Sequence, residues 1–196
     1  MLENALTKRG YSLKVKLTVK SLVSVGIIAL AVILPQIVHA ILGASGGVQW
    51  LPMYLPVLLG GCLLGTLWGL GVGVLSPVVS FLITLAAGSP MPALARLPFM
   101  VVELAIFAAI SGLFSKRIAQ NAWMAFPAVL LGAVAGRSAF MLLVVIFQSV
   151  APFTPALIWS QIQAGLPALL LQCVLVPFLV MGLNFLLNRE KKNHRD

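Results

Sequence analysis

Two ionisable residues, Glu103 and Arg137, lie inside stretches of sequence that are otherwise apolar. A charge within a membrane-spanning segment costs at least about 2.5–3.5 kcal/mol on insertion scales, so it normally faces the protein interior and has a partner. A carboxylate and a guanidinium could form a structural ion pair, or they could both contact a polar ligand. They do not make an obvious proton relay. The sequence leaves the ion pair and the ligand contact open.

A third charge, Arg96, precedes the apolar stretch that contains Glu103. It could snorkel from a helix end to the membrane surface, or it could attract an anionic or hydrogen-bonding substrate. Aromatic residues and amides gather toward the same outer half of the predicted helices. As a set they are typical of a small-molecule site, although a single Trp or Tyr there is more often a membrane-interface anchor. Gln161 and Gln163 belong to this cluster. The candidate substrate-binding residues are Gln36, His39, Trp50, Tyr54, Arg96, Glu103, Arg137, Gln148, Trp159 and Gln172.

Motifs for enzymatic chemistry are absent from the sequence. It has no GxxxxGK[ST] phosphate loop, no HExxH and no serine nucleophile elbow. Cys62 and Cys173 stand in apolar runs without CxxC spacing or nearby His ligands, which indicates apolar filler rather than a metal site or a disulfide. We therefore expect no enzyme activity, no cofactor and no metal.

Composition points to the lipid bilayer as the solvent of this chain. Of its 196 residues, 61% are hydrophobic and 9% are charged, and the mean hydropathy is +1.09. The net charge of +9 could indicate nucleic acid, but the basic residues flank apolar spans instead of interleaving with aromatic residues. They indicate topology determinants and contacts with anionic lipids, with no nucleic-acid partner.

Eleven of the thirteen Lys and Arg residues form three clusters: Lys8, Arg9, Lys14, Lys16 and Lys20; Lys116 and Arg117; Arg189, Lys191, Lys192 and Arg195. Cytoplasmic loops collect Lys and Arg, so an even number of crossings must separate each cluster from the next. A cleaved signal peptide ending near His39 is a second interpretation of the N-terminus, but its removal would break this parity.

The apolar stretches cover 21–38, 55–87, 97–115, 122–150 and roughly 156–187. The second is too long for one span of about 20 residues, and parity requires it to cross twice, with a tight turn near 65–69. The sixth helix is expected to start near 165–167, where Pro167 suits a first helical turn, and 154–163 is expected to be a separate outer element.

The predicted fold is thus an all-α integral membrane protein of six helices with both termini in the cytoplasm. Its parts are a basic N-terminal segment (1–20), one transmembrane domain (21–188) and a basic tail (189–196). Within the second and third helices, Gly61, Gly65, Gly69 and Gly73 recur four residues apart. Small residues at this spacing let helices approach closely in lipid, either within the bundle or against a partner protein.

Three segments carry a family resemblance. LPMYLPVLLGGCLLGTLWGLGVGVLSPVVSFLIT (51–84) is similar to the second and third helices of the substrate-binding S component of energy-coupling-factor (ECF) vitamin transporters. RLPFMVVELAIFAAISGLFSKR (96–117) resembles their fourth helix, and AGRSAF (135–140) resembles their fifth-helix motif.

The resemblance implies a prokaryotic, multi-pass plasma-membrane protein. It would capture a vitamin or related micronutrient from outside, such as cobalamin, its α-ribazole precursor or another water-soluble vitamin. A transmembrane coupling subunit and two ATPase subunits would drive uptake, and small residues of the first helix would dock onto the coupling subunit: Ser24, Gly26, Ala29 and Ala31. A self-sufficient secondary transporter or a small membrane scaffold remain alternatives.

Overall fold

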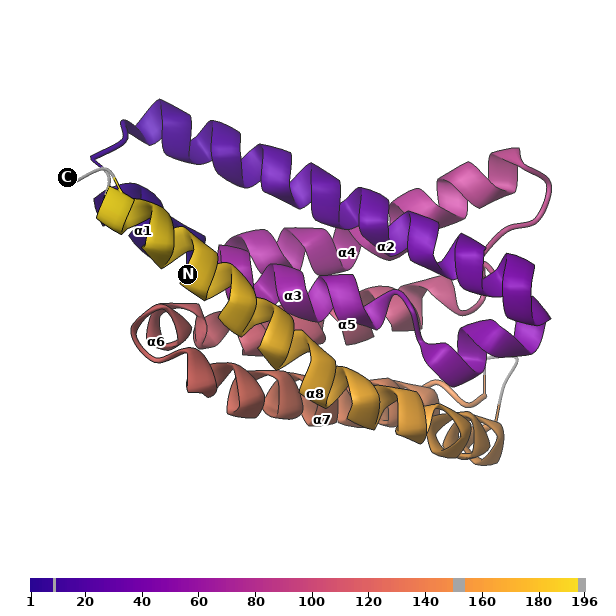
Figure 1. Ribbon diagram of the computed structural model, residues 1–196. Helices are drawn as coiled ribbons and strands as arrows, with labels where there is room; N and C mark the ends of the chain where they lie inside the picture. Colours follow the sequence, from indigo (N-terminus) through magenta and orange to yellow (C-terminus); the bar gives the residue numbers. More distant parts are fainter. Residues whose placement is uncertain (9, 150–153, 194–196) are drawn as a thin grey trace.

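The computed structural model describes residues 1–8, 10–149 and 154–193, and within these ranges all of the regular secondary structure is helical, with no strand (Figure 1). The all-α prediction is therefore confirmed. The elements are α1 (Leu2–Lys8), α2 (Leu13–Trp50), α3 (Tyr54–Leu64), α4 (Thr66–Ala86), α5 (Leu97–Leu113), α6 (Ser115–Gln120), the 3-10 helix η1 (Ala122–Met124), α7 (Ala125–Ile146) and α8 (Pro155–Asn193).

Among the described residues, four helical segments are long and apolar enough to cross a membrane: Leu13–Gly43, Thr66–Ala86, Ala122–Ile146 and Pro155–Leu187. The other two apolar helices are shorter, with 11 residues in α3 and 17 in α5. At 1.5 Å per residue these helices measure roughly 16 and 25 Å, less than the hydrocarbon thickness of about 30 Å. The structure thus provides four candidate spans, and the six-span topology remains a prediction.

Helices α2, α3, α4, α5, α7 and α8 run alternately toward and away from one end of the bundle (Figure 1). At that end the Lys20 Nζ lies 2.7 Å from the Glu3 Oε2, which ties α1 to α2. This ammonium holds the pKa of the Glu3 carboxyl below its usual range. The Asn184 amide of α8 donates to the Ile118 carbonyl of α6 at 3.4 Å.

We call this the basic end, because α1, the start of α2, α6 and the last turns of α8 carry the basic clusters to it. Arg9 of the first cluster and Arg195 of the third lie outside the described residues. The α2–α3 and α4–α5 connections, the end of α7 and the start of α8 lie at the opposite end of the bundle (Figure 1). The described members of the three basic clusters thus lie at one end of the bundle, and the membrane topology itself remains a prediction.

Cysteine labelling tests the predicted orientation. In a background lacking Cys62 and Cys173, Lys116→Cys at the basic end should react with an impermeant maleimide only from the cytoplasmic side. Thr154→Cys at the opposite end should react only from outside, and both positions are exposed. Labelling of the two sites from the same side would contradict the topology.

Two local expectations have different outcomes. The turn predicted near 65–69 is confirmed at Gly65, which separates α3 from α4 with φ of 88°, a conformation that favours glycine. The separate outer element at 154–163 is wrong, because α8 is continuous from Pro155 and includes Pro167 and Pro177. A proline removes one backbone donor, but packing within a bundle holds the helix together across it.

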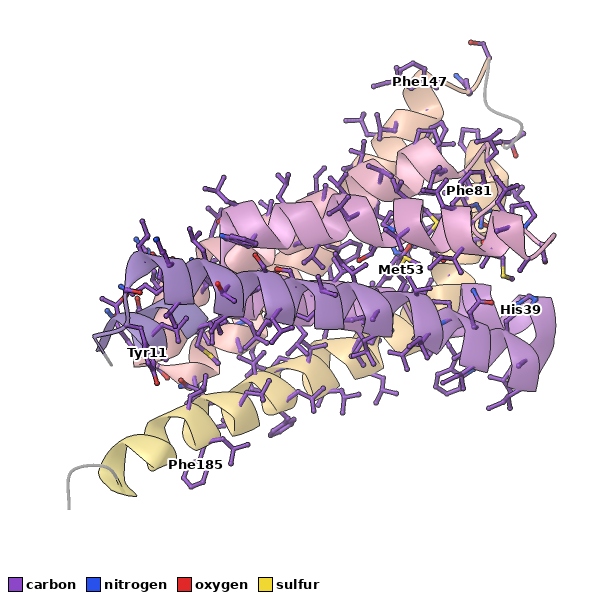
Figure 2. All side chains as sticks on the ribbon, turned by 90° about the horizontal axis from the view of Figure 1, so that it is seen from above. Tyr11, His39, Met53, Phe81, Phe147 and Phe185 are labelled. Atoms are coloured by element: carbon purple, nitrogen blue, oxygen red, sulfur yellow. The ribbon has the colours of Figure 1, made fainter. Side chains whose placement is uncertain are left out.

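Large apolar side chains cover the flanks of the bundle (Figure 2). Leu22, Leu67 and Phe185 are 72%, 85% and 64% exposed, and similar residues follow along α2, α4, α7 and α8. Apolar surface on this scale is unfavourable in water but is the surface that lipid tails require. Inside the bundle, polar side chains line one cavity, to which Met53 also contributes.

Candidate functional site

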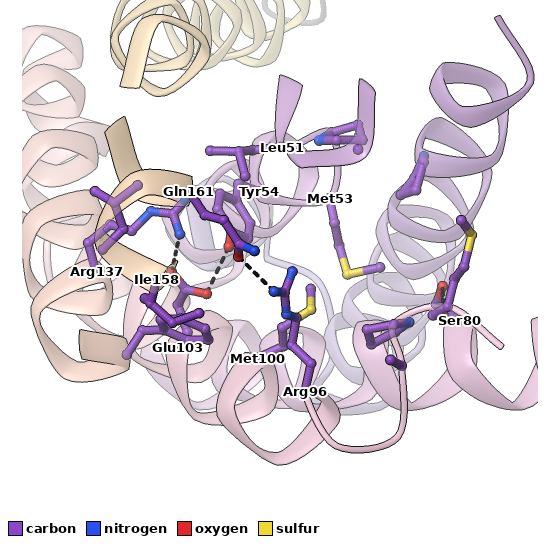
Figure 3. A pocket seen from close by; sticks show the side chains of 18 of the residues that line it. Leu51, Met53, Tyr54, Ser80, Arg96, Met100, Glu103, Arg137, Ile158 and Gln161 are labelled. Atoms are coloured by element: carbon purple, nitrogen blue, oxygen red, sulfur yellow. Dashed lines mark hydrogen bonds and ion pairs between the residues drawn. The ribbon is translucent and has the colours of Figure 1, made fainter. Parts of the chain in front are cut away.

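A cavity of about 400 Å³ opens at the end opposite the basic end. Helices α2, α3, α4, α5, α7 and α8 contribute to its wall, together with the segment 91–96 that precedes α5 (Figure 3). Its polar lining consists of His39, Tyr54, Ser80, Arg96, Glu103, Arg137 and Gln161. The rest of the wall is mostly apolar.

Three polar side chains form a connected group at the depth of this cavity. The Tyr54 hydroxyl donates to the Glu103 Oε2 at 2.8 Å, and the Arg137 Nη1 lies 3.0 Å from the Glu103 Oε1. The Arg137 guanidinium also stacks over the Tyr54 ring at 4.8 Å from its centroid. The Glu103 side chain is fully buried and that of Arg137 is 13% exposed. Of the two alternatives that the sequence left open, the ion pair between Glu103 and Arg137 is present, while ligand contact stays a prediction because both residues also line the cavity; Tyr54 joins the pair.

Close helix packing brings this group together. A Cβ on Gly136 would lie 3.0 Å from the Glu103 carbonyl and closer still to the Phe107 ring, so only glycine lets α7 approach α5 at this level. Arg137 follows directly on α7 and meets Glu103 on α5. Tyr54 is the first residue of α3, which packs between them.

Arg96 joins two elements at the mouth of the cavity. It immediately precedes α5, and its Nη2 donates to the Gln161 Oε1 on α8 at 2.6 Å. Gln161 stands in the first two turns of α8, so this bond fixes the outer part of α8 against the start of α5.

The apolar wall offers a flexible surface. Met53, Met91 and Met100 line the cavity together with Leu51, Phe140, Ile158 and Ile162. Methionine side chains adapt to the shape of a bound molecule, and their sulfur atoms make favourable contacts with aromatic rings. The wall is therefore suited to a compact apolar or aromatic body, while the polar groups would fix its orientation.

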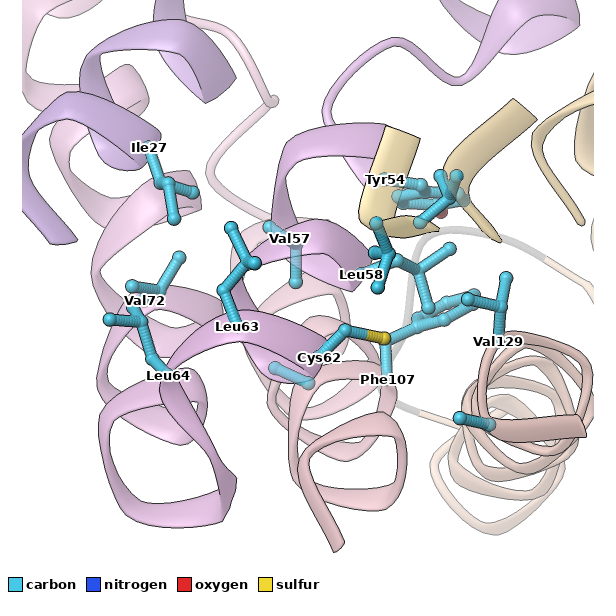
Figure 4. Close-up of a cluster of buried hydrophobic side chains, with 14 of the residues drawn as sticks. Ile27, Tyr54, Val57, Leu58, Cys62, Leu63, Leu64, Val72, Phe107 and Val129 are labelled. Carbon is cyan, nitrogen blue, oxygen red and sulfur yellow. The ribbon is translucent and has the colours of Figure 1, made fainter. Parts of the chain in front are cut away.

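The cavity ends against a packed core. The Tyr54 ring lies 5.0 Å from the Phe107 ring, and beneath them Val57, Leu58 and Val129 are fully buried (Figure 4). Gly61 of α3 packs so tightly on Ala108 of α5 that a Cβ would lie 2.5 Å from the Ala108 carbonyl. The cavity therefore does not continue through the bundle as a pore to the basic end.

Five of the candidate substrate-binding residues line the cavity: His39, Tyr54, Arg96, Glu103 and Arg137. The other five lie outside it. Trp50, Gln148 and Trp159 are exposed, and the indole positions suit the membrane interface. Gln172 donates its amide to the Trp50 and Leu51 carbonyls at 2.9 and 3.1 Å, so it supports the end of α2. Gln36 is half-buried, and its Nε2 has no partner among the described residues.

The four candidate docking residues divide between two faces of α2. Ser24 and Ala31 are buried, and the Ser24 hydroxyl donates to the Lys20 carbonyl at 2.8 Å. Gly26 and Ala29 are exposed. Residues seven apart on a helix share a face, so Ser24, Ile27 and Ala31 point into the bundle. A partner could reach only Gly26 and Ala29 of this set without unpacking α2.

The sequence reasoning assigned no role to Ser80 or to the three cavity methionines, and it left Gln161 out of the candidate set although Gln161 stood in the predicted cluster. An apolar residue in an apolar sequence carries no signal of its own. What distinguishes Gln161 is its hydrogen bond with Arg96. That contact joins residues 65 positions apart in the sequence, so no local pattern could indicate it.

Comparisons with protein-family models, with curated proteins and with solved structures found no match to this chain. Within the described part of the chain, no group of three or more His, Cys, Asp or Glu side chains is placed to hold a metal ion. The site is thus defined by its own geometry: a cavity closed at one end, with two guanidinium groups and one buried carboxylate.

Proposed function

We propose that this chain is the substrate-binding subunit of an energy-coupling-factor type importer, which captures a vitamin-like small molecule from outside the cell. The observation that carries the proposal is the cavity of about 400 Å³, which is built around a buried ionic group and closed toward the basic end. Small-molecule sites typically enclose about 300–1,000 Å³ and combine apolar walls with a few fixed polar groups.

The closed floor favours a binding subunit over a channel. Tyr54 and Phe107 separate the cavity from the rest of the bundle, so a bound molecule has no continuous path along the bundle axis. Delivery to the other side would require a movement of the whole subunit, for which partners must supply the energy. In this proposal ATP hydrolysis takes place on separate ATPase subunits that are coupled through a membrane partner, which agrees with the lack of a phosphate-loop motif in the sequence.

The cavity also bears on the size of the substrate. Its volume lies at the lower end of the range for small-molecule sites, which favours compact vitamins or α-ribazole over the much larger cobalamin. A small membrane scaffold protein does not need a buried ionic group that faces a cavity, so this feature does not favour the scaffold alternative.

Transport by the isolated chain tests the proposal. The purified protein in liposomes should bind one small molecule per chain but should not accumulate it, even with an imposed proton or sodium gradient. Accumulation should appear only when a coupling subunit, its two ATPases and internal ATP are added. Gradient-driven accumulation by this chain alone would instead establish a self-sufficient secondary transporter.

A further inference from the structure

We infer that Thr84 and Ser80 are positioning residues of the ligand site, because together they fix the segment that forms one side of the cavity. This inference rests on the proposed function, since it takes the cavity to be the ligand site, and it adds a determinant of affinity that lies behind the cavity wall. Thr84 does not line the cavity itself, so it can act on a ligand only through the residues that it holds in place.

The segment between α4 and α5, residues 87–96, contains no helix, yet it forms part of the cavity wall. The backbone N–H and C=O groups of a non-helical segment at membrane depth have no helix partners and little water, so each needs a partner in the surrounding protein. The position of this part of the wall therefore depends on those partners. The segment contributes Met91, Pro92, Ala93, Ala95 and Arg96 to the wall.

Both backbone groups of Met91 are satisfied by side chains of α4. The Met91 N–H donates to the Thr84 Oγ1 at 2.7 Å, and the Met91 carbonyl accepts from the Ser80 hydroxyl at 3.0 Å. The Thr84 hydroxyl donates in turn to the Ser80 carbonyl at 2.7 Å. Ser80 and Thr84 share one face of α4 and are only 1% and 5% exposed. Because hydrogen bonds are stronger where water is excluded, this pair fixes the position and the direction of the backbone at Met91.

A third hydroxyl on the same face of α4 behaves differently. Ser76 lies one turn before Ser80 and is also buried, but its hydroxyl donates to the Val72 carbonyl of its own helix at 2.7 Å. This is the local bond that a serine in an apolar helix commonly makes. The Ser80 hydroxyl instead reaches a carbonyl 11 residues away, outside its helix. The contrast indicates that Ser80 serves the neighbouring segment rather than α4.

The segment and the buried ionic group lie on two sides of the cavity. In Figure 3, Ser80 stands on the side opposite Glu103 and Arg137. A ligand that contacts both sides requires a constant distance between them. Because the bonds to Met91 fix the segment before a ligand arrives, binding does not have to order it, and a site that is ordered in advance binds more tightly. Loss of the Thr84 hydroxyl should therefore weaken binding.

A spin label on Leu94 tests the fixing of the segment without any ligand. Leu94 is 68% exposed, so Leu94→Cys can be labelled in a background lacking Cys62 and Cys173. Thr84→Val removes the hydroxyl at nearly constant volume and should increase the mobility of this label, whereas Thr84→Ser should keep the wild-type spectrum. A label at Leu82, which is 56% exposed on α4, should not change. Unchanged mobility at Leu94 in Thr84→Val would overturn the inference.

Heat protection measures the effect on binding, with the small-molecule fraction of yeast extract as the probe. The rise in Tm depends on the ligand concentration relative to Kd, so the amount of extract that gives a fixed rise compares affinities, whatever the Tm of each variant without extract. Thr84→Val should need roughly tenfold more extract than the wild type, because a buried N–H loses its acceptor and the wall is no longer fixed. Thr84→Ser should restore the wild-type amount.

Ser76→Ala is the matched control. It removes a buried hydroxyl from the same face of α4, but one that bonds only within that helix. Both the label at Leu94 and the amount of extract should match the wild type. If Thr84→Val does not fold, Ser80→Ala tests the same pair, since it removes only the bond to the Met91 carbonyl. Unchanged mobility at Leu94 in Ser80→Ala would then overturn the inference.

The outcomes separate this inference from the proposed function. An extract that does not protect the wild-type chain would contradict the proposed function and the inference with it. Equal protection of Thr84→Val and the wild type would leave a substrate-binding subunit standing and overturn the positioning role. An equal loss in Thr84→Val and Thr84→Ser would also overturn that role, because the effect would then not come from the hydroxyl.

Discussion

Glu103→Gln and Arg137→Gln should each lower the free energy of unfolding by about 3–5 kcal/mol, the cost of leaving one member of a buried ion pair without its partner. In the first variant the Arg137 guanidinium, 13% exposed, faces no carboxylate. In the second the fully buried Glu103 carboxylate keeps only its hydrogen bond from Tyr54. Thermal and denaturant unfolding in detergent would measure both effects.

The double variant Glu103→Gln/Arg137→Gln should recover much of this stability, because two neutral amides replace two charges and the Tyr54 hydroxyl keeps an acceptor. We expect it to fold but to lose substrate affinity by more than tenfold, which corresponds to about 1.4 kcal/mol. Tyr54→Phe is the control that removes one hydrogen bond to a charged group and should cost about 1.5–3 kcal/mol. A folded double variant with unchanged affinity would exclude both residues from the binding site. Single variants as stable as the wild type would show that the pair does not hold the fold.

Gly73→Ala should destabilise the bundle by roughly 1–3 kcal/mol or more, although it adds a single methyl group. The added Cβ would lie 2.5 Å from the Leu104 carbonyl oxygen, 2.8 Å from its carbon and 2.9 Å from the Ala105 Cα. All three are backbone atoms of α5, so no side chain can rotate away and α4 must separate from α5. Phe107 lies three residues after Leu104 on α5 and packs against Tyr54 beneath the site, so a displaced α5 should weaken ligand binding as well.

Gly71→Ala provides the matched control. It lies two residues away on the same helix, and nothing stands within 4 Å of its added Cβ. This variant should be neutral or slightly more stable, because alanine is favoured over glycine in a helix by about 1 kcal/mol. Melting temperatures of the two variants in one detergent would make the comparison. Equal stability would mean that the α4–α5 contact is looser than the structure has it.

The same contacts decide between the two interpretations of the glycine series. Gly61, Gly69 and Gly73 all meet backbone atoms of neighbouring helices within the chain, so they serve packing inside the bundle. Gly65 forms the turn between α3 and α4, and Gly71 faces open space. Four-residue spacing alone could not make this distinction, because helices of one chain and of two chains pack by the same rule.

Charge was the strongest source of correct prediction. Two isolated charges in apolar segments need partners, so the sequence indicated either an ion pair between Glu103 and Arg137 or a shared ligand, and the structure places the two side chains 3.0 Å apart. Amides and aromatic residues carried less information. Gln172 satisfies backbone carbonyls at the end of α2, and Trp159 is exposed, although both had the composition expected of a binding site.

The amino-acid sequence by itself determined the class of this protein: an apolar, helical chain with basic clusters at one end and a small number of buried charges, because the cost of charge in lipid constrains every residue independently of the fold. Only the tertiary structure decided which residues surround one cavity. Arg96 meets Gln161 across 65 positions of sequence and Tyr54 meets Glu103 across 49, and the apolar wall differs from other apolar residues only by its position. Helix packing, which depends on a few glycine contacts between backbones, sets those positions, and no local pattern in the sequence reports them.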